Sequence, residues 1–429
     1  VMDGKENSPR PLSLKKNILW NSIGSMFYLV CQWVITILVV RLSSGFDAAG
    51  LFSLATSVVG TFGTLANYKI GTYQISDIHR ENAFSEYLAF RCLTLCASFL
   101  LCLLYALVTC PLYSISTVIL YYIYKSIGLV VDIFHGEDQL NRRLDYIGKS
   151  FILQGVISIA AFSLLFPLTQ NLNLAIIAMS FGVLGVLLLF DCRNTSQFQN
   201  IALGISKAKA LHLLKKSLPA VIASVAASAI FTIPKQYLLG FSGDAALGIY
   251  SSIAAPCLVV QMGAQYLYGP LLDVFPRKFF DGCMRDFKRL LFKTSLSIIG
   301  VAIVCGIGLF LLGEPLLAFV FGDDIRPYVY LLQPVLLSTL LTAFLWFFGD
   351  LLITVRDFKA YFIGNILALF STLPLSAVCI PLWGMNGVSF ASSVACACGI
   401  TYLGIALRND AYTQLKCEKN NGQEAANER

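Results

Sequence analysis

The chain has 429 residues, of which 57% are hydrophobic and only 13% are charged. Soluble domains carry about 25% charged residues, so this chain cannot cover a water-facing surface, and its composition excludes an ordinary soluble protein. The formal net charge of +7 would suit nucleic acid, but the charges are spread over short breaks between apolar runs. We expect no nucleic-acid partner.

Apolar runs long enough to cross a bilayer recur along the chain. Runs of about 20 apolar residues predict membrane helices, because lipid forces backbone polar groups to pair within the segment. The first run follows a polar segment without a cleavage site, which indicates a retained helix and not a signal peptide. We predict an all-α integral membrane protein with about twelve such helices, at 18–40, 48–68, 87–108, 114–134, 148–168, 173–191, 217–240, 247–271, 291–313, 328–351, 358–381 and 385–407.

The Lys and Arg residues follow the positive-inside rule along this pattern. With the N-terminus placed inside, the outer loops hold only Arg41 and Arg326, and Arg91, Lys125 and Lys235 fall within spans. All the others lie in inner segments, which accounts for the net charge by topology. We therefore predict that both termini are cytoplasmic, and that Arg91, near an inner helix end, lies at the lipid–water interface.

The longest internal polar stretch lies midway and divides the chain into two lobes of six helices. Its segment ALGISKAKALHLLKK (202–216) has the pattern of a basic amphipathic helix on the inner leaflet. The expected organisation is a cytoplasmic N-terminus at 1–17, an N-lobe at 18–191, a basic amphipathic cytoplasmic linker at 192–216, a C-lobe at 217–407 and a cytoplasmic tail at 408–429.

The two halves share short motifs in the same order. LKK precedes the first helix at 14–16 and the seventh at 214–216, and Asp-Ala-Ala follows these helices at 47–49 and 244–246. Two copies of six helices share one orientation, which predicts a parallel pseudo-twofold repeat and a cavity between the lobes. The sequence leaves open the alternative that such short strings recur by chance.

Cysteine and histidine usage does not indicate a metal site. The thirteen cysteines include no CxxC pair, and most lie in apolar runs, as buried thiols do. The three histidines, His79, His135 and His212, lie in or near predicted polar loops. We expect no metal and no cofactor.

One predicted helix carries ionisable residues at membrane depth, where such residues usually face a cavity or a partner. Lys125 lies near the middle of the fourth span, and Tyr121 and Asp132 share its helix face at spacings of four and seven. This predicts a cationic cavity wall in which Lys125 and Tyr121 bind substrate and Asp132 serves ion coupling or gating. The alternative is a Lys125–Asp132 pair that locks the lobe.

Four further residues are candidates for substrate binding. Lys235 follows Pro234 in the seventh helix, where proline allows a bend, and Arg41 ends the first helix. For both, the alternative is snorkelling to the interface. Asn21 and Gln265 lie within spans and can bond a sugar hydroxyl, with helix–helix hydrogen bonds as the alternative. A net positive cavity suits a phosphate or pyrophosphate group.

Several motifs, loose one by one, recur in a specific order along nearly the whole chain. They are Asn21-Ser22, RLSSGFDAAGLFSLA (41–55), YQISD (73–77), IPKQYLLGFSGDAALGIYSSI (233–253), GEPLLAFVFGDD (313–324) and GMNGVSFASS (384–393). Together they resemble the polysaccharide-exporter branch of the MOP flippase superfamily, the Wzx-type oligosaccharide flippases.

The resemblance implies a MATE-like fold of two six-helix lobes around a cationic cavity. It implies translocation of polyprenyl-pyrophosphate-linked oligosaccharide from the inner to the outer leaflet of the bacterial plasma membrane by alternating access, for cell-surface polysaccharide biosynthesis. Implied partners are the lipid-linked oligosaccharide, membrane lipid, H⁺ or Na⁺ as the coupling ion, and polysaccharide polymerase machinery. Lys235 matches, by position, the basic residue that the family carries in its seventh helix.

Other classes fit less well. An ion-coupled multidrug exporter of the same superfamily is the nearest alternative, but it would want cavity carboxylates and the first helix has none. A major-facilitator transporter carries G-x-x-x-D-R after its second helix, and here Gly71 is followed by Ile75 at the fourth position. A membrane glycosyltransferase or polymerase would need larger outer loops, so we expect no enzyme activity.

Overall fold

The computed structural model describes residues 12–77, 80–272, 274–280 and 284–427, and every regular element in these ranges is helical. The all-α class predicted from the sequence is confirmed. The chain divides into two compact units, Val1–Val225 and Ala226–Arg429.

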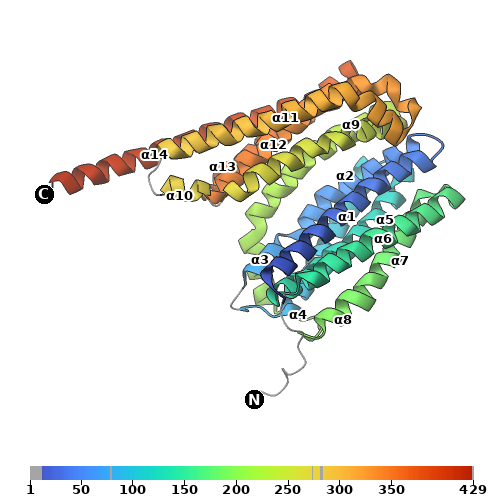
Figure 1. Ribbon diagram of the computed structural model, residues 1–429, viewed down its shortest axis with the longest axis horizontal. Helices are drawn as coiled ribbons and strands as arrows, with labels where there is room; N and C mark the ends of the chain where they lie inside the picture. The colour runs from blue at the N-terminus through green and yellow to red at the C-terminus, as the bar shows by residue number, and fades with distance from the viewer. Residues whose placement is uncertain (1–11, 78–79, 273, 281–283, 428–429) are drawn as a thin grey trace, which may run out of the picture. The chain divides into compact units, whose positions relative to one another are not determined.

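Unit 1 holds the first helices of the chain, drawn from blue to green in Figure 1. They are α1 (Leu14–Leu42), α2 (Asp47–Asn67), α3 (Ile70–Ser76), α4 (Phe84–Thr109), α5 (Leu112–Leu140), α6 (Leu144–Thr169), α7 (Leu172–Val186), the π-helical turn η1 (Leu187–Asp191), α8 (Cys192–Thr195) and the start of α9 (Lys207–Tyr268).

Unit 2 takes the rest of α9 and the remaining elements. These are η2 (Gly269–Leu271), α10 (Val274–Phe280), α11 (Met284–Phe321), η3 (Asp323–Leu331), α12 (Leu332–Thr354), α13 (Phe358–Trp383) and α14 (Met385–Asn427).

Within the described ranges, eleven helices are long and apolar enough to cross a membrane. One of them, Ser217–Tyr268, has 52 residues and contains Gly243 with φ 83° and ψ −179°, outside the helical region. This segment covers two of the predicted spans, so all the predicted spans fall on helices. The chain is a multi-pass membrane protein.

The two halves break their helices at corresponding places. In the first half α1 ends at Leu42 and α2 begins at Asp47. In the second half the non-helical Gly243 directly precedes Asp244. Each half is therefore interrupted just before its Asp-Ala-Ala motif, as the internal repeat predicts.

Small residues let the first and fifth spans approach closely. In unit 1 α1 packs along α6, while α5 contacts α2, α4 and α7. A Cβ added to Gly24 of α1 would meet the backbone of Gly148 of α6, and one added to Gly148 would meet the backbone of Trp20. Glycines at such crossings are typical of membrane helices, because close backbone approach replaces the missing hydrophobic driving force.

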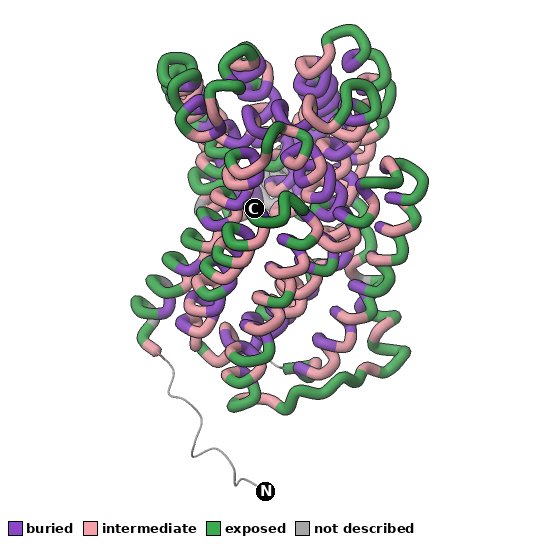
Figure 2. The backbone as a smooth tube through the Cα atoms, turned by 90° about the vertical axis from the view of Figure 1, so that its right-hand side faces the viewer, coloured by how far each residue is buried: buried purple, intermediate pink, exposed green. Residues whose placement is uncertain are grey.

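Apolar side chains also cover the outside of the helices. Figure 2 shows exposed and buried residues alternating along individual helices. On α4, Leu100, Leu104 and Val108 are each more than 60% exposed. Large apolar side chains this exposed indicate contact with lipid rather than water.

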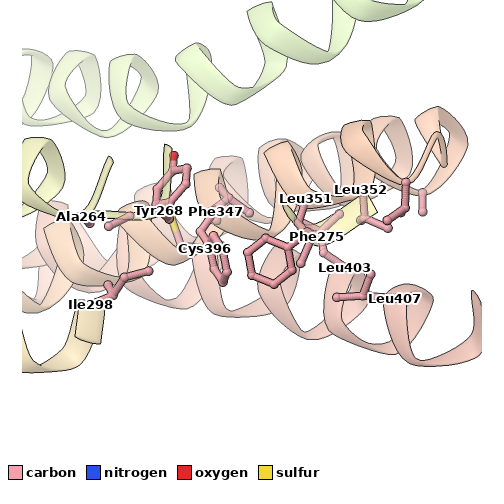
Figure 3. Close-up of a cluster of buried hydrophobic side chains, with 14 of the residues drawn as sticks. Ala264, Tyr268, Phe275, Ile298, Phe347, Leu351, Leu352, Cys396, Leu403 and Leu407 are labelled. Atoms are coloured by element: carbon pink, nitrogen blue, oxygen red, sulfur yellow. The ribbon is translucent and has the colours of Figure 1, made fainter. Parts of the chain in front are cut away.

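An aromatic cluster forms the core of unit 2 (Figure 3). The ring of Phe347 lies 5.1 Å from that of Tyr268 and 5.9 Å from that of Phe275, measured between centroids. The Tyr268 hydroxyl donates to Oδ2 of Asp350 at 2.9 Å. Leu403 of α14 packs into the same cluster.

The polar segment between the halves is helical only in part. Residues 196–206 are not helical, and α9 begins at Lys207 and continues into the membrane span. Lys209 Nζ lies 2.7 Å from Glu86 Oε2, and the Tyr68 hydroxyl donates to the Leu214 carbonyl at 3.0 Å. The first turns of α9 are thus fixed to unit 1. At the other end of the chain α14 continues past Arg408 to Asn427.

Arg91, predicted at the lipid–water interface, is enclosed by protein side chains and backbone in unit 1. Its side chain is fully buried, with Nη1 donating to the Ala66 carbonyl at 2.8 Å and Nη2 to Asn67 Oδ1 at 3.0 Å. The last carbonyls of a helix lack helical partners. Arg91 supplies such a partner to the end of α2, which accounts for a buried guanidinium.

His135, predicted in or near a polar loop, lies inside a helix and is buried. The helix α5 runs to Leu140, beyond the predicted end of its span, and His135 is only 6% exposed. Both α3 and η1 pack against this end of α5. Those contacts bury polar residues that hydropathy alone assigns to a loop.

Candidate functional site

A cavity of about 250 Å³ lies within unit 1, between α1, α2, α5 and α6. Its polar side chains are Tyr28, Thr56, Tyr121, Lys125, Asp132 and Gln154. Pockets for drug-sized ligands run from about 300 to 1,000 Å³. The cavity is therefore of a size for one small charged group.

Neutral groups hold the Lys125 ammonium in this cavity. Its Nζ donates to Oε1 of Gln32 at 3.2 Å, and Nε2 of Gln32 donates to the Tyr124 hydroxyl at 3.0 Å. The same hydroxyl lies 3.2 Å from Oγ of Ser158. This chain of hydrogen bonds across α1, α5 and α6 fixes the orientation of the Gln32 amide and, through it, the position of Nζ.

Two aromatic rings flank the ammonium. Lys125 Nζ lies 5.6 Å from the ring centroid of Tyr121 and 5.5 Å from that of Tyr124, within the range of cation–π attraction. Tyr121 is itself held edge-on by Phe52, with centroids 5.4 Å apart. The rings stabilise a positive charge without neutralising it.

Asp132 lines the same cavity but does not form an ion pair with Lys125. Its charge reaches Lys125 electrostatically, but the ion pairs within 4.0 Å in the described part of the chain do not include these two residues. The locking pair considered from the sequence is therefore not formed here.

Glycines leave the cavity open. Gly60 and Gly63 of α2 and Gly128 of α5 line it, and a Cβ added at any of them would meet no atom within 4 Å. This contrasts with Gly148, where an added Cβ collides with the backbone of α1. The cavity glycines make room for a ligand and not for a neighbouring helix.

Three of the predicted site residues come together here: Tyr121, Lys125 and Asp132 all line the cavity. Two others on α1 do not. Asn21 is partly exposed, and Arg41 is exposed near the end of the helix.

The remaining two predicted residues belong to unit 2. Lys235, partly exposed, and Gln265, exposed, both lie on α9. Neither lines the apolar groove of about 470 Å³ that unit 2 has between α11 and α12. Their roles in binding stay predictions.

Tyr28, Gln32 and Tyr124 were not among the site residues predicted from the sequence. A signal was present in the spacing. Tyr28 and Gln32 stand four apart on α1, and Tyr124 adjoins Lys125. Two helices that each place polar and aromatic groups on one face, in otherwise apolar spans, indicate a shared polar interior.

A larger cavity, of about 520 Å³, lies at the end of unit 1 where α3, α4 and α5 meet the polar loops. Two of its acidic side chains are ion-paired: Arg80 Nη2 lies 3.1 Å from Glu137 Oε1, and Lys209 Nζ lies 2.7 Å from Glu86 Oε2. Asp77 and Glu81 also line it, so this cavity has more acidic than basic side chains and does not suit an anion.

Comparison with known proteins identifies relatives by sequence and by fold. No family model matches the chain. It is 24% identical over 388 residues to the capsular polysaccharide biosynthesis protein CapF of Staphylococcus aureus, a match covering 89% of this chain and 96% of that protein. The lipid II flippase MurJ, in an inward closed conformation, superposes with a TM-score of 0.68 at 13% identity, covering 93% of this chain and 90% of MurJ.

A multidrug resistance MATE family transporter of the MOP superfamily, in its inward-facing conformation, superposes with a TM-score of 0.65 at 12% identity, covering 92% of this chain and 99% of that structure. The chain has the MOP-superfamily fold. The resemblance predicted from the sequence is confirmed at this level, and CapF adds a relative from capsular polysaccharide biosynthesis. These two structures are of a flippase and of a transporter.

Proposed function

We propose that this chain is a flippase, not an enzyme, that moves polyprenyl-pyrophosphate-linked oligosaccharide from the inner to the outer leaflet of the bacterial plasma membrane. The product serves cell-surface polysaccharide biosynthesis. The observation that carries the proposal is the Lys125 ammonium, held by an amide oxygen and two rings in a small cavity. The similarity to CapF supports the substrate class.

The cavity suits the charged part of such a substrate. Pyrophosphate cannot cross hydrocarbon unaided, because burying a charge without a partner costs many kcal/mol. An ammonium acts on phosphate as a point charge, and its attraction is stronger away from bulk water. A volume of about 250 Å³ holds the pyrophosphate group alone. The oligosaccharide then stays in water, and the polyprenyl chain stays in lipid.

Asp132 gives the cavity a means of ion coupling. An ionised Asp132 offsets the charge of Lys125, with which it interacts electrostatically. A proton on Asp132 leaves the cavity with a net positive charge. Protonation therefore strengthens the binding of an anion, and release of the proton weakens it.

Translocation follows from two states of the whole chain. In this proposal both termini are cytoplasmic, and the lobes open the cavity first to the inner and then to the outer side. The two states must have similar free energies, so that substrate and ion binding can shift their populations. No covalent step is needed.

A second function has one observation in its favour. Asp132, Tyr28 and Tyr121 in the cavity wall are groups that can hold an organic cation, as a multidrug exporter of this fold requires. The two functions differ in the sign of the charge on the transported substrate.

A flipping assay in vesicles decides between them. The full chain is reconstituted with a fluorescent polyprenyl-pyrophosphate oligosaccharide, and an impermeant quencher reports the share of the lipid in each leaflet. Protein-dependent movement between leaflets supports the flippase. No movement with several glycans, together with export of a cationic dye by the same vesicles, would replace it by the multidrug exporter.

A further inference from the structure

A second group of ionisable side chains is buried in unit 1, away from the wall of the Lys125 cavity. His135 and Asp138 come from the end of α5, and Asp191 ends the π-helical turn η1. They are 6%, 0% and 1% exposed. We call these three residues the buried triad.

The triad lacks the hydrogen bonds that buried polar groups normally have. Nε2 of His135, Oδ2 of Asp138 and both carboxylate oxygens of Asp191 have no hydrogen-bond partner. His135 Nε2 and Asp191 Oδ1 lie 3.6 Å apart, within ion-pair range but too far for a hydrogen bond. Since more than nine in ten buried polar groups in proteins are paired, a cluster of orphaned atoms needs an explanation.

A neighbouring carboxylate shows that burial alone is not the reason. Asp145 is 2% exposed, and its oxygens accept from Arg143 Nε at 2.8 Å and from Lys149 Nζ at 3.1 Å. Asp145 thus has Arg and Lys partners, whereas no ion pair with Arg or Lys is formed by Asp138 or Asp191 in the described part of the chain.

The local backbone places Asp191 toward His135. The chain follows α-helical geometry to Val186 and then makes one π-helical turn before α8. Such turns are rare and recur at functional sites. Beyond the turn, Thr195 donates to Oδ1 of Asp138 at 3.3 Å, which leaves Oδ2 of Asp138 as the oxygen without a partner.

Charge counting points to the ligand. With no proton bound, the triad holds two negative charges in a buried site, which is costly. Each proton removes one charge, on a carboxylate oxygen or on Nε2 of His135. Among the described residues no group of His, Cys, Asp and Glu side chains has the arrangement of a metal site. A proton is the ligand that lowers this buried charge.

Other titratable groups on the surrounding elements do not neutralise the triad. Glu137 is paired with Arg80 at 3.1 Å, and the ring of Phe151 packs edge-on against His135 at 4.8 Å. The remaining groups on elements packed against this end of α5 are Tyr73 of α3, Arg91 of α4, Asp132 of α5, Tyr146 of α6 and Cys192 of α8.

Asp132 connects the triad to the cavity. It lines the cavity with Lys125, and the charge of His135 reaches it from one turn further along α5. We propose that His135, Asp138 and Asp191 form a proton-binding site that exchanges protons with Asp132 and so couples a proton gradient to the cavity. The coupling rests on the proposed function, whereas proton binding by the triad does not.

Infrared difference spectra between about pH 5 and 8, the range in which histidine titrates, test proton binding without transport. The full chain in lipid vesicles should show the C=O stretching band of a protonated carboxylic acid at the lower pH. The band should weaken or vanish in Asp191→Asn and Asp138→Asn and persist in Glu137→Gln, a paired carboxylate beside the triad. The same bands in all four proteins would overturn the proposal. His135→Gln, which should shift the pH at which the band appears, carries the test if an aspartate variant does not fold.

The flipping assay under a pH gradient tests the coupling. One pH unit changes the steady-state leaflet ratio by at most about tenfold for each coupled proton. The wild type should respond to the gradient, and Asp191→Asn should flip without responding. An intact infrared signal without flipping of any lipid would remove the proposed function and leave the proton site standing. Flipping that responds equally to the gradient in Asp191→Asn would remove the coupling role.

Discussion

The ammonium nitrogen of Lys125 lies 3.2 Å from the amide oxygen of Gln32, a partner that carries no charge. A carboxylate at this place would form an ion pair and neutralise the ammonium, while an amide only orients it. The contact joins α1 to α5, so the position of the charge depends on how these helices pack.

The neutrality of Gln32 can be tested directly. Gln32→Glu keeps the shape of the side chain and places a negative charge beside Lys125, so we expect the initial flipping rate to fall by roughly tenfold or more, the effect of one charged hydrogen bond. Gln197→Glu, at an exposed position outside the helices, is the control for the same change of charge and should keep the wild-type rate. An unchanged rate in Gln32→Glu would mean that the charge of Lys125 is not used.

Gly128 should be needed for space and not for folding. Gly128→Leu places a side chain where an added Cβ meets no atom within 4 Å, so we expect the cavity to fill and flipping to be lost while the unfolding temperature stays near that of the wild type. Flipping and thermal unfolding are measured on the same preparation. Normal transport by this variant would show that the substrate does not enter the cavity.

Gly148 should behave in the opposite way. Its added Cβ would meet the backbone of Trp20, and overpacking of this kind costs about 1–3 kcal/mol. We therefore expect Gly148→Val to lower the unfolding temperature in detergent. The pairing of Gly128→Leu with Gly148→Val separates blocking of the cavity from damage to the fold, and a stable Gly148→Val would show that α1 and α6 do not cross here.

The ionised Asp77 carboxylate should make the free energy of unfolding depend on pH. Burial raises the pKa of its carboxyl, but hydrogen bonds from the Tyr87 hydroxyl at 2.7 Å and from the backbone N–H groups of Glu81 and Asn82 outweigh this and hold the pKa below its usual value. A depressed pKa contributes stability that is present above the unfolded value of about 3.9 and lost as the pH falls through the folded value.

Thermal unfolding as a function of pH measures this contribution. Asp77→Asn should be less stable than the wild type at neutral pH by about 1–3 kcal/mol, and the two should converge as the pH falls below about 4. Asp286→Asn, at a carboxylate that is 57% exposed, should show no such convergence. A constant gap between Asp77→Asn and the wild type at every pH would contradict the assignment.

The sequence predicted the helices and the face that carries the cavity residues. Apolar runs mark membrane helices because lipid leaves the backbone no other partner. The spacing of Tyr121, Lys125 and Asp132 is a property of one helix, so it needs no knowledge of the fold. The structure places all three in one cavity.

What the sequence did not predict depends on packing between helices. That Gln32 reaches Lys125 follows from the approach of α1 to α5 and α6, which no local pattern encodes. His135 was expected in or near a polar loop because it directly follows the predicted apolar span 114–134. Its burial comes from α3 and η1, and a π-helical turn has no recognisable sequence signal.

The most direct test of the account is the flipping rate of the Lys125→Ala variant. Lys149→Ala is the matched control, since Lys149 lies in the same unit and pairs with Asp145 at 3.1 Å outside the cavity. We expect Lys125→Ala to fold but to flip polyprenyl-pyrophosphate oligosaccharide at least about tenfold more slowly than the wild type. Lys125→Arg should recover part of the rate, and Lys149→Ala should flip at the wild-type rate. A folded Lys125→Ala variant that flips at the wild-type rate would show that the Lys125 cavity is not part of the transport path.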